Sequence, residues 1–251
     1  YATAFDALIV QHAEEPSLAR NGAMNEGELA TRLGMKGIPT AAETIMVDRD
    51  IRLVEMTGAR YHAAHLTTAK ALDAVRRAKA DGLPVTCGTA PLYFALNENE
   101  VNGYRTFAKV SPPLRSEDDR RAVVAAIRDG TIDVISSGHA PEDPEAKRQP
   151  FEQAEFGAVG LETMLALGLQ LHMSEDVPLL SVLACMTCNP ARLLGLDCGV
   201  LAAGHPADLV IFRARSYSEL LSRPQHDRIV LREGNAIDTT PPDYRVLDGI
   251  L

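Results

Sequence analysis

The sequence predicts an α/β fold with a parallel sheet, and two observations lead to it. Short apolar runs alternate four times with helical segments between residues 7 and 135, a pattern typical of parallel sheets. Polar loops bearing histidines follow some of these runs, and folds of this kind keep their chemistry at the carboxyl ends of their strands. A closed barrel needs eight strand–helix units, so four units indicate an open sheet or half of a barrel.

The expected elements follow in order along the chain. Strands are expected at 7–10, 60–66, 83–87 and 132–135, and helices at 25–33, 41–56, 68–80 and 117–128. Asp81 and Gly82 end the third of these helices, and Ser116 is a suitable N-cap for the fourth. Further on, we expect helices at 160–173 and 178–194, a strand at 207–212 and a hairpin at 229–237 turning at Gly234 and Asn235.

Composition and charge exclude several classes of partner. The net charge of −9 and the pI near 5.3 argue against nucleic acid or an anionic membrane as the main partner, because both require a basic surface. No apolar run reaches the length of a membrane span, and the first residues lack the basic start of a signal peptide. Cys185 and Cys188 form a CxxC within an apolar helical pattern, which favours buried thiols over a metal or redox site. This cysteine usage fits a cytoplasmic protein.

Several sequence runs, in this order, carry a family resemblance. They are QHAEEPSLARNGAMNEGELATRLGMKGIPTAAE, YHAAHLTT, RAKADGLPVTCGTAP, KVSPPLRSEDDR, GTIDVISSGHAPED and PFEQAEFGAVGLETML, followed by NPARLLGL and AAGHPADLVIF. Over about Phe5 to Phe212 the chain resembles dihydroorotase of the long bacterial type, in the amidohydrolase superfamily. The resemblance implies a (β/α)8 TIM-type barrel. Residues 1–200 would supply roughly strands 5–8, its C-terminal half, and residues 201–251 the closing segment and strands of a small β domain.

The resemblance also implies a function. Members hydrolyse a cyclic amide, interconverting dihydroorotate and N-carbamoyl-aspartate in pyrimidine synthesis, with zinc to activate a water. By position, His12 and His65 would be metal ligands. Ser111, Phe156 and Gly157 would contact the small-molecule pyrimidine precursor. A lone histidine is more often a packed structural residue, which is the role expected for His62, but matched flanking motifs favour ligands at the other two positions.

The chain also departs from the family pattern at positions where the resemblance implies catalytic or substrate-binding residues. The Asp that precedes His-Ala-Pro in the family, a metal ligand and general base, is Gly138 here, and the chain contains no HxH motif. The family's Asn before Pro-Pro-Leu-Arg is Ser111. His139 is then a weak candidate for the missing base, although a solvated loop is the simpler interpretation. Lys147, in the same loop, is expected at the surface.

Three hypotheses stay open at this stage. The first is a dihydroorotase whose other site elements lie on sequence outside this chain. The second is a catalytically inactive homologue that acts as a structural partner of aspartate transcarbamoylase. The third is another cyclic amidase, of hydantoin or allantoin type. Strand edges left open by a half barrel also predict a longer natural protein or tight association, including a homo-oligomer.

Overall fold

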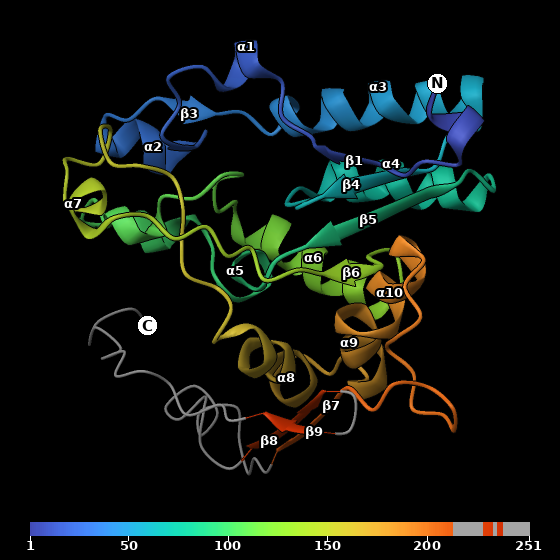
Figure 1. The fold of residues 1–251 in the computed structure, drawn as a ribbon. Coiled ribbons are helices and arrows are strands. Elements are labelled where there is room, and N and C mark those ends of the chain that lie inside the picture. The colour runs from blue at the N-terminus through green and yellow to red at the C-terminus, as the bar shows by residue number, and fades with distance from the viewer. Residues whose placement is uncertain (213–227, 233–234, 238–251) are drawn as a thin grey trace. The chain divides into compact units, whose positions relative to one another are not determined.

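A computed structural model of the chain describes residues 1–212, 228–232 and 235–237. It divides into two compact units, Tyr1–Leu161 and Glu162–Leu251, which are described separately (Figure 1). The predicted division at residue 200 stays a prediction. The strands of the first unit are β1 (Ile9–His12), β2 (Met24–Asn25), β3 (Gly37–Ile38), β4 (Tyr61–Ala64), β5 (Val85–Thr89) and β6 (Val134–Ile135). Its helices are α1 (Pro16–Ala19), α2 (Glu28–Leu33), α3 (Ala41–Thr57), α4 (Ala69–Ala80), α5 (Pro91–Ala95), α6 (Glu117–Arg128) and α7 (Pro144–Lys147), with 3-10 turns at Ala2–Phe5, Glu98–Val101 and Thr106–Ala108.

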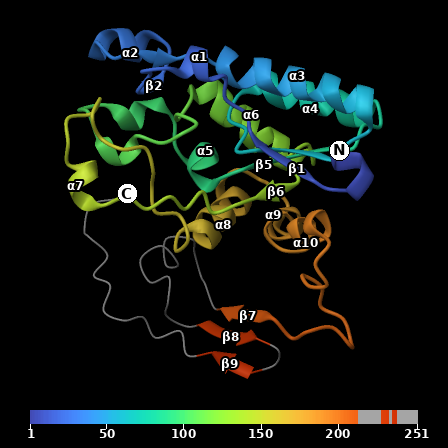
Figure 2. The same cartoon turned by 45° about the horizontal axis from the view of Figure 1, so that its top comes forward.

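The main sheet of the first unit has the order β1-β4-β5-β6, and all three pairings are parallel. His12 is level with Ala64, and Thr89 is level with Ile135, so the strands end along one edge. Helices α3 and α4 cover one face of this sheet (Figures 1 and 2). The structure therefore confirms the predicted α/β fold and its four parallel strands. The short pair β2–β3, also parallel, was not predicted.

Strand β1 lies at the end of the described sheet. Its hydrogen-bonded neighbour there is β4. Ile9 and Val10 are 42% and 56% exposed, unusual for apolar side chains of a parallel sheet. Among the described residues β1 is thus an edge strand, and the open edge of a half barrel stays a prediction.

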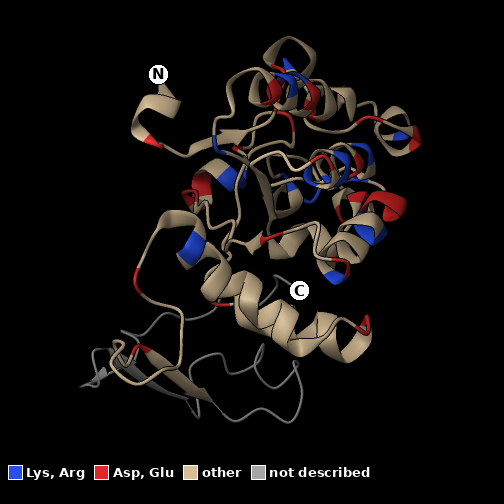
Figure 3. Ribbon diagram, turned by 90° about the vertical axis from the view of Figure 1, so that its right-hand side faces the viewer, with Lys and Arg blue, Asp and Glu red and all other residues tan. Residues whose placement is uncertain are grey.

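Helices α4 and α6 show why these segments are helical. Thr68 caps α4 by accepting from the amide of Ala71, and Ser116 caps α6 by accepting from that of Asp119. One face of α4 is buried, including Leu72. The outward faces of α3, α4 and α6 carry acidic and basic residues intermixed (Figure 3). No helix among the described residues is long and apolar enough to cross a membrane.

A buried polar network joins the loops beyond the sheet. The Glu43 carboxylate on α3 accepts hydrogen bonds from the amides and hydroxyls of Thr67 and Thr68, directly after β4. Arg115, 3% exposed, donates to the Thr67 hydroxyl, to the side chain of Asn25 on β2 and to the carbonyl of Ile38 on β3. Several runs behind the family resemblance, GAMNEG, TAAE, HLTT and PPLR, thus meet in one buried cluster.

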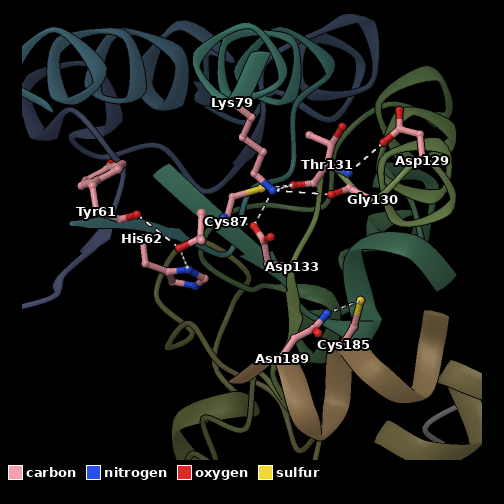
Figure 4. A network of polar contacts seen from close by, with 11 residues as sticks. Tyr61, His62, Lys79, Cys87, Asp129, Gly130, Thr131, Asp133, Cys185 and Asn189 are labelled. Atoms are coloured by element: carbon pink, nitrogen blue, oxygen red, sulfur yellow. Dashed lines mark hydrogen bonds and ion pairs between the residues drawn. The ribbon is translucent and has the colours of Figure 1, made fainter. Parts of the chain in front are cut away.

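A second set of contacts fixes the strands from the helix side (Figure 4). Lys79 on α4 donates to the carbonyl of Thr131 and pairs with Asp133, both at 2.7 Å. Asp133 also accepts from the backbone amide of Cys87 on β5, at 2.8 Å. The Tyr61 hydroxyl donates to Asp50 on α3. These bonds tie β4, β5 and the start of β6 to the helices that cover them.

Two lysines are buried in the loops of the first unit. Lys109 Nζ donates to the carbonyls of Phe151, Glu152 and Ala154, and Lys147 Nζ donates to those of Lys109, Glu155 and Gly157. Each residue is 3% exposed, and burial lowers the pKa of both ammonium groups. The prediction that Lys147 lies at the surface is wrong, because its charge is satisfied by backbone carbonyls rather than by water.

The second unit contains α8 (Met164–Ser174), α9 (Leu179–Met186), α10 (Cys188–Leu194) and the antiparallel strands β7 (Leu209–Phe212), β8 (Arg228–Arg232) and β9 (Asn235–Ile237). The helix predicted at 178–194 is broken at Thr187, whose φ of −129° is not helical. The break separates buried Cys185 from half-buried Cys188, and both thiols are free. The predicted hairpin is confirmed, but the Gly234 position of its turn lies outside the described residues.

Candidate active site at the carboxyl ends of the strands

Two imidazoles meet where neighbouring strands end. His12 is the last residue of β1, and His65 follows the last residue of β4. Their ring centroids are 5.9 Å apart, with an angle of 49° between the ring planes. The expected convergence of these side chains is therefore present, and their role as metal ligands stays a prediction.

His65 has an unusual backbone conformation, and its surroundings favour a neutral ring. Its φ is +55°, in the left-handed region that non-glycine residues rarely occupy and that is often found at functional sites. Burial lowers the pKa of His65, and the neighbouring His12 acts in the same direction. A neutral imidazole is the form that binds a metal or accepts a proton.

His62 has different contacts from the histidine pair. It is 6% exposed, and its Nδ1 lies 2.9 Å from the hydroxyl of Thr86 on β5. A Cβ at Gly88 would lie 3.0 Å from His62 Nε2, so this glycine leaves room for the ring. Burial is the largest cause of the lowered pKa of His62. These contacts fit the structural role expected for it.

The loop after β6 carries Gly138, the position at which the family resemblance led us to expect a base. Gly138 has φ +60°, and a Cβ built there would lie 2.8 Å from the Cβ of Ala90. His139 is exposed, and its Nδ1 accepts a hydrogen bond from the amide of Gly160 at 3.2 Å. With Nδ1 occupied, a neutral His139 ring carries its proton on Nε2. Its remaining nitrogen is then a donor, which weakens its candidacy as a base.

A cavity of about 480 Å³ lies in the first unit and brings together two of the predicted substrate-binding residues, Ser111 and Phe156. Its walls also include Glu14, Lys109 and Glu152. The Lys109 ammonium lies 4.5 Å from the centre of the Phe156 ring, a cation–π contact. Sequence reasoning missed Glu14, although its place two residues after His12 was a signal that could have found it.

Gly157, the third predicted substrate contact, has a different environment. A Cβ there would lie 2.4 Å from the carbonyl oxygen of Ala140, so glycine is required for the two loops to approach. Its amide donates to the carbonyl of Lys109, and its own carbonyl accepts from Lys147. Both backbone groups of Gly157 are thus used within the protein, and its contact with substrate stays a prediction.

The described residues fit only part of a zinc site. Two imidazoles at this separation suit a shared zinc ion, but a catalytic zinc site uses three protein ligands. No group of three or more His, Cys, Asp or Glu side chains that could hold a metal exists among the residues the structure describes. Gly138 has no side chain to add.

Comparison with known proteins shows the family to which the chain belongs. A model of the Amidohydrolase family matches residues 2–240. This chain belongs to the amidohydrolase family. It is 50% identical over 211 residues to a dihydroorotase of Desulforapulum autotrophicum, covering 84% of this chain and 49% of that protein. It is 47% identical over 213 residues to a dihydroorotase of Anaplasma phagocytophilum, covering 84% and 48%. The predicted resemblance is thus confirmed.

Solved structures of other proteins share this fold. The L-hydantoinase of Arthrobacter aurescens has a TM-score of 0.74 at 20% identity, over 93% of this amidohydrolase chain and 57% of its own. The dihydroorotase of Saccharomyces cerevisiae in complex with 5-fluoroorotic acid has a TM-score of 0.63 at 13% identity, over 78% and 52%. At these identities the likeness concerns the fold alone. The chain spans about half the length of the curated relatives it matches.

Proposed function

We propose that this chain forms part of a dihydroorotase-type cyclic amidohydrolase, which interconverts dihydroorotate and N-carbamoyl-aspartate in a cytoplasmic pyrimidine pathway. The observation that carries the proposal is the meeting of His12 and His65 at the ends of two parallel strands. Identities of 47–50% to proteins named dihydroorotase support the choice of substrate. The cavity walled by Ser111 and Phe156 would receive the ring.

The proposal includes zinc, but this chain would provide only some of its ligands. His12 and His65 would provide two ligands, and the described residues do not complete the set. Gly138 cannot act as a base. We propose that the base and the remaining ligands belong to the segment that corresponds to the half of the relatives that this chain does not span. A bound zinc would supply an activated water near neutral pH.

One observation favours a second candidate function. The backbone at Gly138 has a left-handed conformation, and Ala90 occupies the space of a side chain there. A site built in this way is expected in an inactive homologue retained as a structural partner, for example of an aspartate transcarbamoylase. The hydantoin or allantoin alternative has no comparable support, because the hydantoinase likeness is one of fold.

The two candidates differ in a direct measurement on the full-length natural protein. Metal content and turnover of dihydroorotate are measured for the wild type and for His12→Ala and His65→Ala. Stoichiometric zinc and turnover, both lost in either variant, support the enzyme. Zinc-free protein without turnover, which co-purifies with a transcarbamoylase, supports the structural partner.

A further inference from the structure

One carboxylate oxygen is isolated within the first unit. Oε2 of Glu14 is shielded from solvent and has no hydrogen-bond partner, the only side-chain oxygen or nitrogen of that kind among the described residues. Glu14 lines the cavity that also contains Ser111 and Phe156. Burying a polar atom without a partner is costly, and more so for a charged group, so such an atom calls for an explanation.

Neighbouring cations do not provide the missing donor. Lys109 lines the same cavity, but its three ammonium protons go to the carbonyls of Phe151, Glu152 and Ala154. The hydrogen bonds of Arg115 go to Thr67, Asn25 and Ile38. Neither cation is therefore the donor for Glu14, and a molecule that enters the cavity can supply one.

The chemistry of that donor follows from the cavity walls. A carboxylate oxygen accepts a hydrogen bond, so the ligand presents an N–H or O–H group to it. Phe156 offers an aromatic surface, and Ser111 a hydroxyl that can donate or accept. A small ring with a planar run of alternating N–H and C=O groups matches this combination, and 480 Å³ is ample for one such ring.

We propose that Glu14 is a specificity-determining residue that accepts a hydrogen bond from a ring N–H of a cyclic ureide bound in this cavity. The inference rests on the proposed function, since the substrate of that reaction is a cyclic ureide, and it assigns recognition of the ring to a residue outside the metal pair. The neighbouring Glu152 lines the same cavity but is exposed, so water can satisfy its carboxylate. Glu152 is therefore a suitable control position for substitutions of Glu14.

Binding to metal-free, full-length protein tests this, because binding is then separate from turnover. The probes are dihydroorotate, dihydrouracil, their N-methylated analogues, and methylguanidinium as a purely cationic donor. We expect Glu14→Gln and Glu14→Ala to weaken binding of both ureides about ten- to a hundredfold, with Glu152→Gln near wild type. Methylation of the recognised nitrogen should weaken wild-type binding by a similar factor and have little further effect in Glu14→Ala.

The outcomes separate this inference from the proposed reaction. Equal affinity of wild type and both Glu14 variants, no ureide binding at all, or tighter binding of methylguanidinium than of the ureides overturns the role of Glu14. Ureide binding that depends on Glu14, without hydrolysis of dihydroorotate after zinc is added, overturns the reaction and leaves the recognition in place. Thermal melting of each variant identifies loss of fold, and the isosteric Glu14→Gln remains interpretable if Glu14→Ala unfolds.

Discussion

The network around Glu43 and the pair His12–His65 both lie beyond or at the carboxyl ends of the strands, yet they differ in burial and in hydrogen bonding. Glu43 is 2% exposed, and its carboxylate accepts five hydrogen bonds from Thr67 and Thr68. His12 is exposed and lies beside a strained His65. The buried network supports the loops in one arrangement, whereas no third metal-binding side chain joins the histidine pair among the described residues. The framework around the site is thus satisfied internally, and the histidine pair is not.

The largest expected effect is on the buried network. Glu43→Ala leaves two amides and two hydroxyls without their acceptor, and we expect a loss of about 3–5 kcal/mol in the free energy of unfolding. Glu55→Ala, an exposed position on the same helix, should change stability by less than about 0.5 kcal/mol. Urea denaturation measures both. If both variants lose less than about 0.5 kcal/mol in the free energy of unfolding, the network around Glu43 does not stabilise the loops.

The next largest effect on stability is expected when the buried ammonium group of Lys147 is removed. Lys147→Met keeps the apolar stem but removes the donor to three carbonyls, and we expect a loss of about 1–3 kcal/mol. Exposed Lys70 on α4 gives the control, Lys70→Met, with an effect near zero. Hydrogen exchange of the Gly157 amide should also accelerate in Lys147→Met. Unchanged exchange would mean that the lysine does not hold this loop.

A smaller effect on stability is expected for a substitution at Gly138, in the loop after β6. Gly138→Asp introduces the carboxylate expected from the family resemblance, but it places a side chain at φ +60° and 2.8 Å from the Cβ of Ala90. We expect about 1–2 kcal/mol of destabilisation and no gain in turnover. The double variant with Ala90→Gly should recover part of the lost stability, as measured by denaturation. Faster turnover in Gly138→Asp than in wild type would show that the loop accommodates the added carboxylate.

The smallest effect concerns pH. Burial lowers the pKa of His62 below its ordinary 6.5, so below pH 6.5 the unfolded chain binds more protons than the folded one. The contribution of this residue is therefore present above pH 6.5 and lost as pH falls through the lowered pKa. Thermal melts from pH 7.5 to 5 should fall less steeply for His62→Asn than for wild type. An identical slope would mean that His62 is not desolvated in solution.

Much of the fold could be predicted from sequence. The four strands lie within about two residues of their predicted positions, because buried apolar runs bounded by turn residues indicate strands strongly. Helix 117–128 agrees at both ends, where Ser116 caps it and Asp129 ends it. The pair β2–β3 escaped prediction because two residues carry no periodic signal.

The candidate site was less accessible to sequence reasoning. The meeting of His12 and His65 followed from their places at strand ends. The burial of Lys147 did not, because a charged residue in a polar loop predicts solvent until three carbonyls are seen around it. The isolated oxygen of Glu14 and the contact between Gly138 and Ala90 depend on residues far apart in the chain. Such features come from tertiary packing alone.

The outer side of β1 has a practical consequence for handling the protein. The amide of Ile9 bonds to Arg60 beside β4, so the alternation of a strand directs the amide of Val10 the opposite way. An apolar strand with outward amides is a template for another strand, so residues 1–251 prepared by themselves are expected to aggregate through β1 at high concentration. Val10→Lys places a charge at that position and should raise the concentration at which light scattering appears.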